Sequence, residues 1–328
     1  MDPGLESTGN STHTQITCCA LKDSVKKQLI TAAKGFCMGT ADVIPGVSGG
    51  TMAFILGIYT QLINGIRSFD RAWLQALVNM DTGTILGRPH FPFLLPLFTG
   101  IVAALMFFTR VVPLPQLLLD YPEQIYGMFF GLITGSIVVL FRELEQVDRG
   151  TVLALLAGFI FGMVVFNLVP VQTPDAGWFI FIAGILAICA MLLPGISGSF
   201  ILLILNKYTY VFNAIGYLEF RVIIPFFLGA ATGLVAFSRV LSWLLNRYYQ
   251  KTVQVILGLL ASSLWVIWPF QERIYESVGD KGRLVASTPY LPAQTSPAVV
   301  TAVLLMIAGI AVVFMIEHMA KQREKTAD

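Results

Sequence analysis

One five-residue pattern, Pro-Gly-x-Ser-Gly, occurs twice in this chain, at residues 45–49 and again at residues 194–198. Each copy interrupts a long apolar stretch with residues that break helices. Glycine leaves backbone N–H groups uncovered, and serine adds a hydroxyl donor without adding charge. Neutral donors of this kind suit an anion, above all a phosphate group. The two copies are therefore the candidate binding elements of this sequence.

We call residues 45–51 the first tip and residues 194–200 the second tip. In each tip the proline is a hinge, Pro45 or Pro194, and a half-helix is expected to begin near Thr51 or Phe200. The first N–H groups of such a half-helix have no intrahelical partner. The candidate phosphate-binding residues are Gly46, Val47, Ser48, Gly49, Gly50 and Thr51 in the first tip, and Gly195, Ile196, Ser197, Gly198 and Ser199 in the second. The alternative role is structural, with glycines that permit close helix packing and serines that cap half-helices.

Four charged residues near these segments are candidate charge partners. Asp42 is the one acid beside the first tip, and Met191 takes its place in the second copy. An ionised carboxylate at membrane depth is costly, so Asp42 is expected to carry a coupling proton or Na⁺, or to pair with a basic residue. The alternative is a carboxyl group bound by the neighbouring backbone. Arg110 and Arg239 share one repeat position, where each either attracts a lipid phosphate or extends to the headgroups. Lys207 is either a phosphate partner or an interfacial lysine.

The composition is that of a polytopic helical membrane protein. Apolar residues make up 56% of the 328 residues, charged residues 12%, and the mean hydropathy is +0.75. The net charge of +2 gives no reason to expect nucleic acid, and residues 1–20 lack the apolar core of a signal peptide. The 4 cysteines and 3 histidines show no ligand spacing, so neither a metal site nor a cofactor is expected. The expected partners are lipids of the membrane.

The chain also repeats itself. Of the 32 positions in residues 35–66, 12 are identical in residues 184–215, and 7 of 16 agree between residues 96–111 and 225–240. Apolar runs predict six spanning helices, at about residues 92–112, 123–141, 151–169, 222–243, 252–270 and 298–317. The segments are then a polar N-terminal tail at residues 1–27, membrane repeat 1 at 28–170, membrane repeat 2 at 176–318 and a C-terminal tail at 319–328.

The distribution of lysine and arginine favours inverted repeats. If both tips lie on re-entrant hairpins, 15 of these residues fall on the cytoplasmic side and 6 outside; if both motif regions span the membrane, the count is 11 against 10. Because positive residues concentrate in cytoplasmic loops, the first arrangement fits better and places both termini in the cytoplasm. The expected fold is an all-α polytopic membrane protein of two inverted repeats, each a re-entrant, broken helical hairpin plus three transmembrane helices, with the tips meeting near the midplane. Residues 67–91 are expected to form an interfacial amphipathic helix or a plain loop.

The strings at residues 41–51, 57–59 and 193–199 resemble a bacterial family of polyprenyl-phosphate (undecaprenyl-phosphate) translocases, long catalogued as a domain of unknown function. The resemblance covers about residues 28–318, and the string Asp-Val-Ile-Pro-Gly-Val-Ser-Gly-Gly-Thr is specific. It implies a protein of the bacterial cytoplasmic membrane that is not an enzyme. It also implies that the protein returns undecaprenyl phosphate, the carrier lipid of cell-wall synthesis, from the outer to the inner leaflet. A small anionic head needs a polar midplane site, whereas the prenyl tail stays in lipid.

Two other functions use similar elements. Membrane polyprenyl-pyrophosphate phosphatases resemble this chain in architecture, but they need an acidic cluster and an arginine in the corresponding loop. Here the pairs Gly49-Gly50 and Gly198-Ser199 stand where the arginine is needed. A secondary transporter of a small soluble anion is the other alternative, since the same tips would serve it. The route separates the two kinds of transport: a lipid needs lateral openings between helices, and a soluble anion needs an aqueous vestibule.

Overall fold

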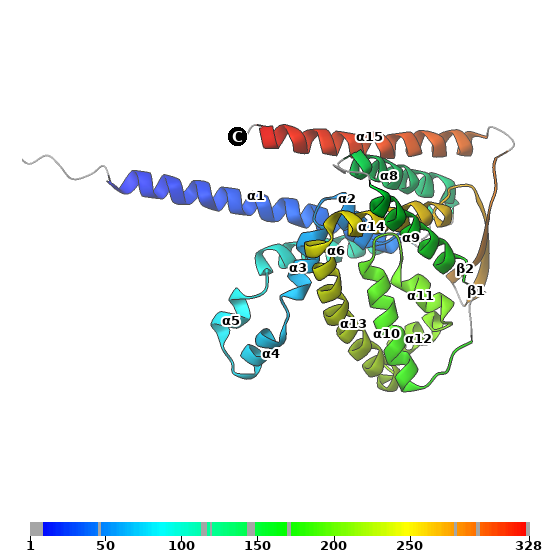
Figure 1. The fold of residues 1–328 in the computed structure, drawn as a ribbon, viewed down its shortest axis with the longest axis horizontal. Helices are drawn as coiled ribbons and strands as arrows, with labels where there is room; N and C mark the ends of the chain where they lie inside the picture. Colours follow the sequence, from blue (N-terminus) through cyan, green and yellow to red (C-terminus); the bar gives the residue numbers. More distant parts are fainter. Residues whose placement is uncertain are drawn as a thin grey trace, which may run out of the picture.

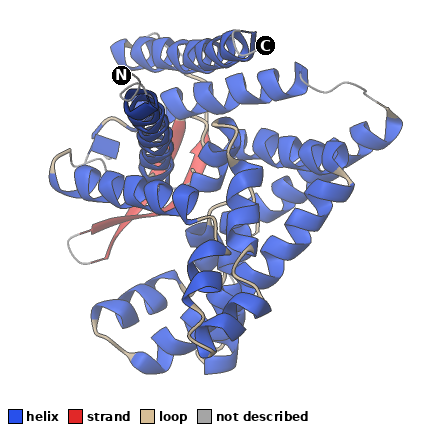
Figure 2. Cartoon of the chain, turned by 90° about the vertical axis from the view of Figure 1, so that its left-hand side faces the viewer, coloured by secondary structure: helices blue, strands red, loops and turns tan. Residues whose placement is uncertain are grey.

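The computed structural model describes residues 9–44, 47–112, 117–118, 120–142, 148–168, 172–278, 281–292 and 296–325. Over these residues the chain forms 14 helices and one antiparallel pair of strands (Figures 1 and 2). The predicted all-α class is confirmed, with a small hairpin added to it. Two residues of the first tip, Pro45 and Gly46, lie outside the described residues.

Five helices within the described residues are long and apolar enough to cross a membrane. They are α6 (Phe91–Arg110), α8 (Pro122–Arg142), α9 (Arg149–Phe166), α13 (Phe220–Arg247) and α15 (Pro297–Lys325). These helices confirm five of the six predicted spanning runs, and they make the chain a multi-pass membrane protein. Many of their large apolar side chains are exposed at the surface of the molecule, as suits helices whose solvent is lipid.

The sixth predicted run, residues 252–270, forms helix α14 (Tyr249–Val266), which is not among those five. Polar side chains interrupt its apolar character, and four of them are buried: Thr252, Gln254, Ser262 and Ser263. Helix α14 packs against both α8 and α9, so these polar groups are surrounded by protein rather than lipid. The predicted helix is confirmed, but its composition is too polar to identify it as a membrane span.

Each motif region is broken at its tip, as predicted, but it forms three helices rather than two half-helices. Helix α1 (Gly9–Val43) precedes the first tip, and α2 (Gly49–Ile55) and α3 (Tyr59–Arg67) follow it. The second copy consists of α10 (Gly177–Leu192), α11 (Gly198–Ile204) and α12 (Tyr208–Gly216). The short helices α2 and α11 begin at equivalent repeat positions, two residues earlier than predicted. Helix α1 also takes in most of the predicted polar tail.

Both short helices end in the same left-handed turn. Gly57 (φ 67°) follows α2, and Asn206 (φ 53°) follows α11 at the equivalent repeat position. In the first copy the N–H of Ile58 then donates a 2.9 Å hydrogen bond to the carbonyl of Ala53, and the second copy closes with the same bond. This arrangement is the Schellman motif, which satisfies the last carbonyls of a helix and redirects the chain. Each tip is therefore held by a short helix with a fixed end.

Equivalent helices of the two halves pack through equivalent glycines. A Cβ atom added to Gly35 of α1 would lie only 2.1 Å from the carbonyl oxygen of Leu97 in α6. A Cβ atom added to Gly184 of α10 would lie 2.3 Å from the carbonyl oxygen of Phe226 in α13. The internal repeat aligns both members of these two pairs. The repetition in the sequence is therefore also a repetition of backbone packing.

The remaining long helices pack across the two halves. Gly131 of α8 lies against the backbone of Met306 in α15, and its repeat equivalent, Gly258 of α14, lies against Leu155 in α9. Helices α8 and α9 follow the first tip in sequence, whereas α14 and α15 follow the second. Each pair thus joins one helix from each half, as α8 and α15 do along one edge in Figure 1. The hydrophobic core is shared between the halves.

Residues 67–91, predicted as an amphipathic helix or a loop, form two short helices, α4 (Arg71–Val78) and α5 (Thr82–Gly87). The Asp70 carboxylate caps α4 by accepting a hydrogen bond from the backbone N–H of Trp73 (3.0 Å). Arg88, just after α5, donates to the other oxygen of Asp70 at 2.7 Å. One carboxylate therefore joins the beginning of α4 to the end of α5.

The strands β1 (Gln271–Val278) and β2 (Lys281–Pro289) are an element that the sequence-based expectation lacks. They pair antiparallel, with Val278 opposite Lys281. The dipeptide Gly279-Asp280 between these paired ends, flanked by strand-forming residues, is a hairpin sequence. A search for long apolar runs overlooks it because the segment is largely polar.

Candidate functional site

The two tips touch each other in the folded chain. The backbone N–H of Gly195 donates a 2.8 Å hydrogen bond to the side-chain oxygen of Thr51. The hydroxyl of Ser48 approaches the carbonyl oxygen of Met191 at 3.4 Å. The structure therefore brings together two groups of candidate residues that are separated by 143 and 144 positions in sequence.

The first tip is enclosed by protein. Its described residues are all buried: Val47, Ser48, Gly49, Gly50 and Thr51. The hydroxyl of Tyr59, itself only 3% exposed, donates a 2.8 Å hydrogen bond to the carbonyl of Leu192 beside the second tip. Sequence reasoning left Tyr59 out of the site, although its identity with Tyr208 in the repeat marked the position. Tyr59 is a third polar link between the halves.

Asp42 is bound by backbone at the start of the first half-helix. Its Oδ1 accepts a 2.7 Å hydrogen bond from the N–H of Gly49, and the next N–H, of Gly50, donates to the Ser48 hydroxyl at 3.2 Å. The carboxylate thus fills the place where an external anion would meet the terminus of α2. Within the described part of the chain the ion pairs are Arg88–Asp70 and Lys207–Asp175, so the expected basic partner of Asp42 is not found there.

The second tip differs because it has Met191 in place of Asp42. The N–H groups of Gly198, Ser199 and Phe200 have no acceptor among the described residues. The hydroxyls of Ser197 and Ser199 lie 2.8 Å apart, and Ser197 makes no capping bond to α11. A serine cap, the structural alternative, thus describes Ser48 but not Ser197. Gly195 and Ile196 are buried and Ser199 is exposed, so the free donors face the rim of this tip.

The two repeat-related arginines have different surroundings. Arg110 is exposed at the last residue of α6, whereas Arg239 is half-buried inside α13, which continues to Arg247. Among the described residues neither guanidinium has a hydrogen-bond or ion-pair partner. The structure therefore does not bring Arg110 or Arg239 into contact with the tips.

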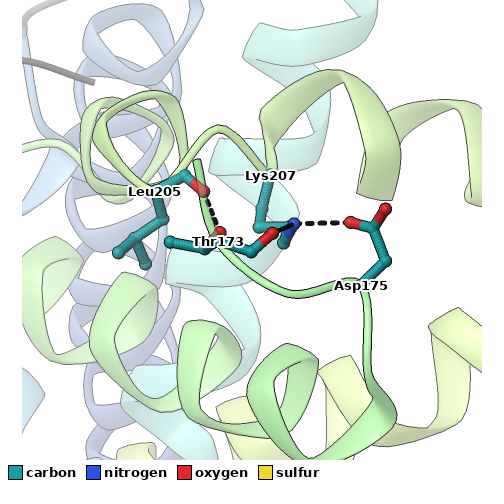
Figure 3. A network of polar contacts seen from close by, with 4 residues as sticks. All are labelled: Thr173, Asp175, Leu205 and Lys207. Atoms are coloured by element: carbon teal, nitrogen blue, oxygen red, sulfur yellow. Dashed lines mark hydrogen bonds and ion pairs between the residues drawn. The ribbon is translucent and has the colours of Figure 1, made fainter. Parts of the chain in front are cut away.

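Lys207 is a buried cation with partners, rather than an interfacial lysine. The residue is 2% exposed, and its Nζ donates to the carbonyl of Thr173 (2.7 Å) and to the carboxylate of Asp175 (2.5 Å) (Figure 3). The Thr173 hydroxyl in turn donates to the carbonyl of Leu205 at the end of α11. These bonds tie the segment before α10 to the turn between α11 and α12. The ammonium group of Lys207 is used in these bonds, so Lys207 has little freedom to bind a ligand.

Lys34 has a related place in the first half. Its Nζ donates a 2.9 Å hydrogen bond to the carbonyl of Leu56, the C-cap residue of α2. Leu56 and Leu205 are repeat equivalents, so a side chain satisfies the same carbonyl in both halves. A cation at this point also complements the negative end of the helix dipole. Sequence reasoning missed Lys34 in this role because the donor and the acceptor are 22 positions apart.

No group of three or more histidine, cysteine, aspartate or glutamate side chains able to hold a metal ion occurs among the described residues. The donors gathered at the tips are hydroxyl and backbone N–H groups, which suit an anion better than a cation.

Most of the chain is similar to proteins that are already known. Residues 38–285 match the model of a family described as undecaprenyl phosphate translocase-like. A polyprenyl-phosphate transporter of Vibrio cholerae is 36% identical over 305 residues, which cover 90% of this chain and 97% of that protein. A polyprenyl-phosphate transporter of Staphylococcus aureus is 30% identical over 262 residues, or 73% of this chain and 86% of that protein. No solved structure matches the chain.

Proposed function

The chain belongs to the undecaprenyl phosphate translocase-like family, and from this premise we propose that it transports polyprenyl phosphate across the bacterial cytoplasmic membrane, from the outer to the inner leaflet. Its curated relatives are transporters and not enzymes. The structural observation that carries the proposal is the contact between the tips, Gly195 N–H to Thr51 hydroxyl, which gathers neutral donors from both halves at one point. Such donors bind a phosphate head without holding it too tightly to release.

The tips suit transport better than hydrolysis. Phosphoryl transfer requires a metal ion or several basic groups to neutralise the developing charge. The tips offer hydroxyls and backbone N–H groups. The charged side chain that binds them directly is the acid Asp42, which accepts a hydrogen bond from Gly49 and adds negative rather than positive charge. A single anionic head passing between leaflets needs only a polar stop in an apolar barrier, while its prenyl chain remains in lipid.

Inverted repeats with re-entrant hairpins remain the architecture that we propose. The equivalent glycine contacts of the two halves support an internal pseudosymmetry. The beginning of α1 and the end of α15 project toward the same side of the molecule, which agrees with two cytoplasmic termini (Figure 1). The excess of lysine and arginine in the segments assigned to the cytoplasm supports the same orientation.

In this proposal the second tip binds the phosphate and the first tip couples transport to a cation. The rim of the second tip, with Ser197, Gly198 and Ser199, offers its free N–H and hydroxyl groups to the phosphate. The first tip is already occupied by the Asp42 carboxylate. Binding of a proton or Na⁺ to Asp42 lowers its negative charge, which removes the repulsion between this carboxylate and the lipid phosphate. Asp42 thereby couples the cation to the lipid phosphate.

The test is a transport assay with the purified chain in liposomes. The leaflet distribution of a short polyprenyl phosphate is followed over time for the wild type, a Ser199→Leu variant of the second tip and a Leu153→Ala variant of the exposed face of α9 as control. We expect protein-dependent movement in the wild type and control and little in Ser199→Leu, because the leucine removes a hydroxyl donor and places a bulky apolar side chain at the exposed rim beside the free N–H groups.

Polyprenyl alcohol is the matched substrate control, since it lacks the phosphate. Equal movement of the alcohol and the phosphate ester would contradict recognition of the head. Uptake of inorganic phosphate without any lipid movement would favour a soluble-anion transporter instead.

A further inference from the structure

Two adjoining cavities lie between α1 and the beginning of α6. The first, of about 600 Å³, is lined among others by Lys26, Lys27, Lys34, Gln61 and His90. The second, of about 750 Å³, is apolar. Gln28 and Pro92 line both, so the two lie side by side. We call them the basic cavity and the apolar groove.

The basic cavity concentrates positive charge. Three lysines line it, and none of the described residues that line either cavity is acidic. Lys26 and Lys27 are exposed on α1 and have no hydrogen-bond or ion-pair partner among the described residues. Three ammonium groups in one cavity attract an anion, and a monophosphate ester carries a charge between −1 and −2 near neutral pH.

The apolar groove exposes large side chains beside this charge. Leu29 is 65% exposed, Leu95 59% and Leu86 68%, and they come from α1, α6 and α5. Phe91 and Pro96 of α6 also line the groove. A groove open on one side and lined from three helices suits an apolar chain that is partly covered by protein.

The basic cavity is connected to the first tip by a single short helix. Lys34 lines the cavity and binds the last turn of α2 through the carbonyl of Leu56. The other end of α2 is the first tip, where Gly49 meets Asp42. Seven residues of helix separate the two ends, which is roughly 10 Å at 1.5 Å per residue. A ligand in the cavity thus lies one half-helix away from the tip.

We propose that the basic cavity and the apolar groove together form a docking site for one polyprenyl phosphate, with its phosphate on Lys26 and Lys27 and its first isoprene units along Leu29 and Leu95. The proposal rests on the proposed function and adds a second stop for the same lipid. The site lies on the side that the charge distribution assigns to the cytoplasm, so it receives the lipid after passage. One anionic head beside one groove matches a single-tailed phosphate lipid rather than a two-tailed phospholipid.

The direct test is equilibrium binding to the full chain in nanodiscs made of zwitterionic lipid. The probe is geranylgeranyl phosphate, and the variant is the double substitution Lys26→Gln/Lys27→Gln. Lys251→Gln, an exposed lysine outside both cavities, is the matched control. Loss of two charge-assisted contacts is expected to weaken binding by about tenfold or more, whereas the control stays within about twofold.

The groove is tested by filling it. Leu95→Trp is expected to weaken binding of geranylgeranyl phosphate severalfold, whereas Leu153→Trp, at a similarly exposed site on α9, leaves it unchanged. Both substitutions are at exposed positions, so neither disturbs the core. Geranylgeraniol, which lacks the phosphate, is expected to bind weakly and to be indifferent to the lysine substitutions.

Four outcomes overturn the docking site or its place in transport. Equal binding by the double lysine variant and the wild type shows that the cavity does not hold the phosphate. Equally effective competition by phosphatidylglycerol shows a general anionic-lipid surface, and competition by inorganic phosphate alone shows a site for the free ion.

Transport in the liposome assay that persists in the double variant at the wild-type rate removes the docking step but leaves the proposed function intact. Binding without any transport by the wild type removes the function and keeps the site.

Discussion

Thr51 and Gly195 are joined by a hydrogen bond of 2.8 Å, in which the backbone N–H of Gly195 donates to the side-chain oxygen of Thr51. Both groups are buried, so no water competes for either of them. Gly195 adopts φ 96°, a conformation that side chains disfavour, and this turn directs its N–H toward the first tip. The threonine therefore fixes the position of one tip relative to the other.

Replacement of Thr51 by valine is expected to destabilise the protein by roughly 1–3 kcal/mol, because it leaves the buried N–H of Gly195 without an acceptor. Valine has nearly the same shape, so packing is preserved. Thr51→Ser keeps the oxygen and is the matched control. Denaturant unfolding in detergent measures the difference, and a valine variant as stable as the serine variant would contradict the role of this bond.

Two glycines with positive φ are expected to respond differently to substitution. Gly57 (φ 67°) has open space around its Cα atom, whereas a Cβ atom on Gly195 would lie 2.9 Å from the carbonyl oxygen of Leu259. Since Asn206 occupies the equivalent left-handed position in the second half, Gly57→Asn is expected to cost less than about 1 kcal/mol. Gly195→Asn adds a steric clash to the backbone strain.

Unfolding midpoints of the two asparagine variants, measured side by side, test this expectation. The Gly195 variant should lose several degrees more than the Gly57 variant. A larger loss at Gly57 would show that the turn after α2 is constrained by more than its backbone conformation.

Apolar runs and breakers were enough to predict most elements of this fold. The long helices follow from runs of about twenty apolar residues, and the broken regions follow from Pro-Gly-x-Ser-Gly. The partner of each helix did not follow, because helices that are apolar on all sides carry no pattern that selects one neighbour. The pairing of α8 with α15 and of α9 with α14, each across the two halves, is therefore visible only in the structure.

In the candidate site, too, the sequence predicted the elements but not the partners of individual groups. The repeated motif located both tips, and their contact agrees with the prediction that they meet. The partner of Asp42 did not follow from sequence, since a backbone N–H at Gly49 is chemically like any other and only the turn between them brings it within 2.7 Å. Lys34 and Lys207 act through carbonyl groups, which no residue type identifies.

The pair of Lys207 and Asp175 is expected to show an asymmetric response to mutation. Asp175→Asn leaves a buried ammonium group without its counter-charge, which is expected to cost roughly 1–3 kcal/mol, since the exposed carboxylate is partly screened by solvent. Lys207→Met removes the buried charge and keeps the length of the side chain, so it is expected to cost less. Thermal unfolding of the two single variants and the double variant measures the coupling. A lysine variant that is less stable than the aspartate variant would contradict this account.

Order in α4 and α5 is expected to depend on pH through Asp70. The hydrogen bond from Arg88, followed by that from the backbone of Trp73, lowers the pKa of this carboxyl below its ordinary value of 3.8. A carboxyl with a lowered folded pKa stabilises the fold above its unfolded pKa, and this contribution is lost as the pH falls through the folded pKa. Amide hydrogen exchange in residues 71–87 should therefore accelerate below pH 3.8 relative to the same residues in Asp70→Asn. Parallel pH profiles for the two proteins would exclude Asp70 as the cause.

Asp42 provides the sharpest test of coupling. The asparagine of an Asp42→Asn variant still presents an oxygen to the N–H of Gly49, so the turn is expected to fold normally. That side chain has no charge to neutralise, so the variant is expected to lose the dependence of lipid transport on pH or on Na⁺ that the wild type shows. The rate of polyprenyl phosphate movement in liposomes, measured from about pH 5 to about pH 9 with and without a Na⁺ gradient, distinguishes the variant from the wild type. Ser48→Ala, which removes a neighbouring acceptor of the same helix terminus but no charge, is the control and should keep the wild-type profile. If Asp42→Asn transports as the wild type does at every pH and Na⁺ concentration, the carboxylate acts only as a cap of α2 and coupling must reside elsewhere.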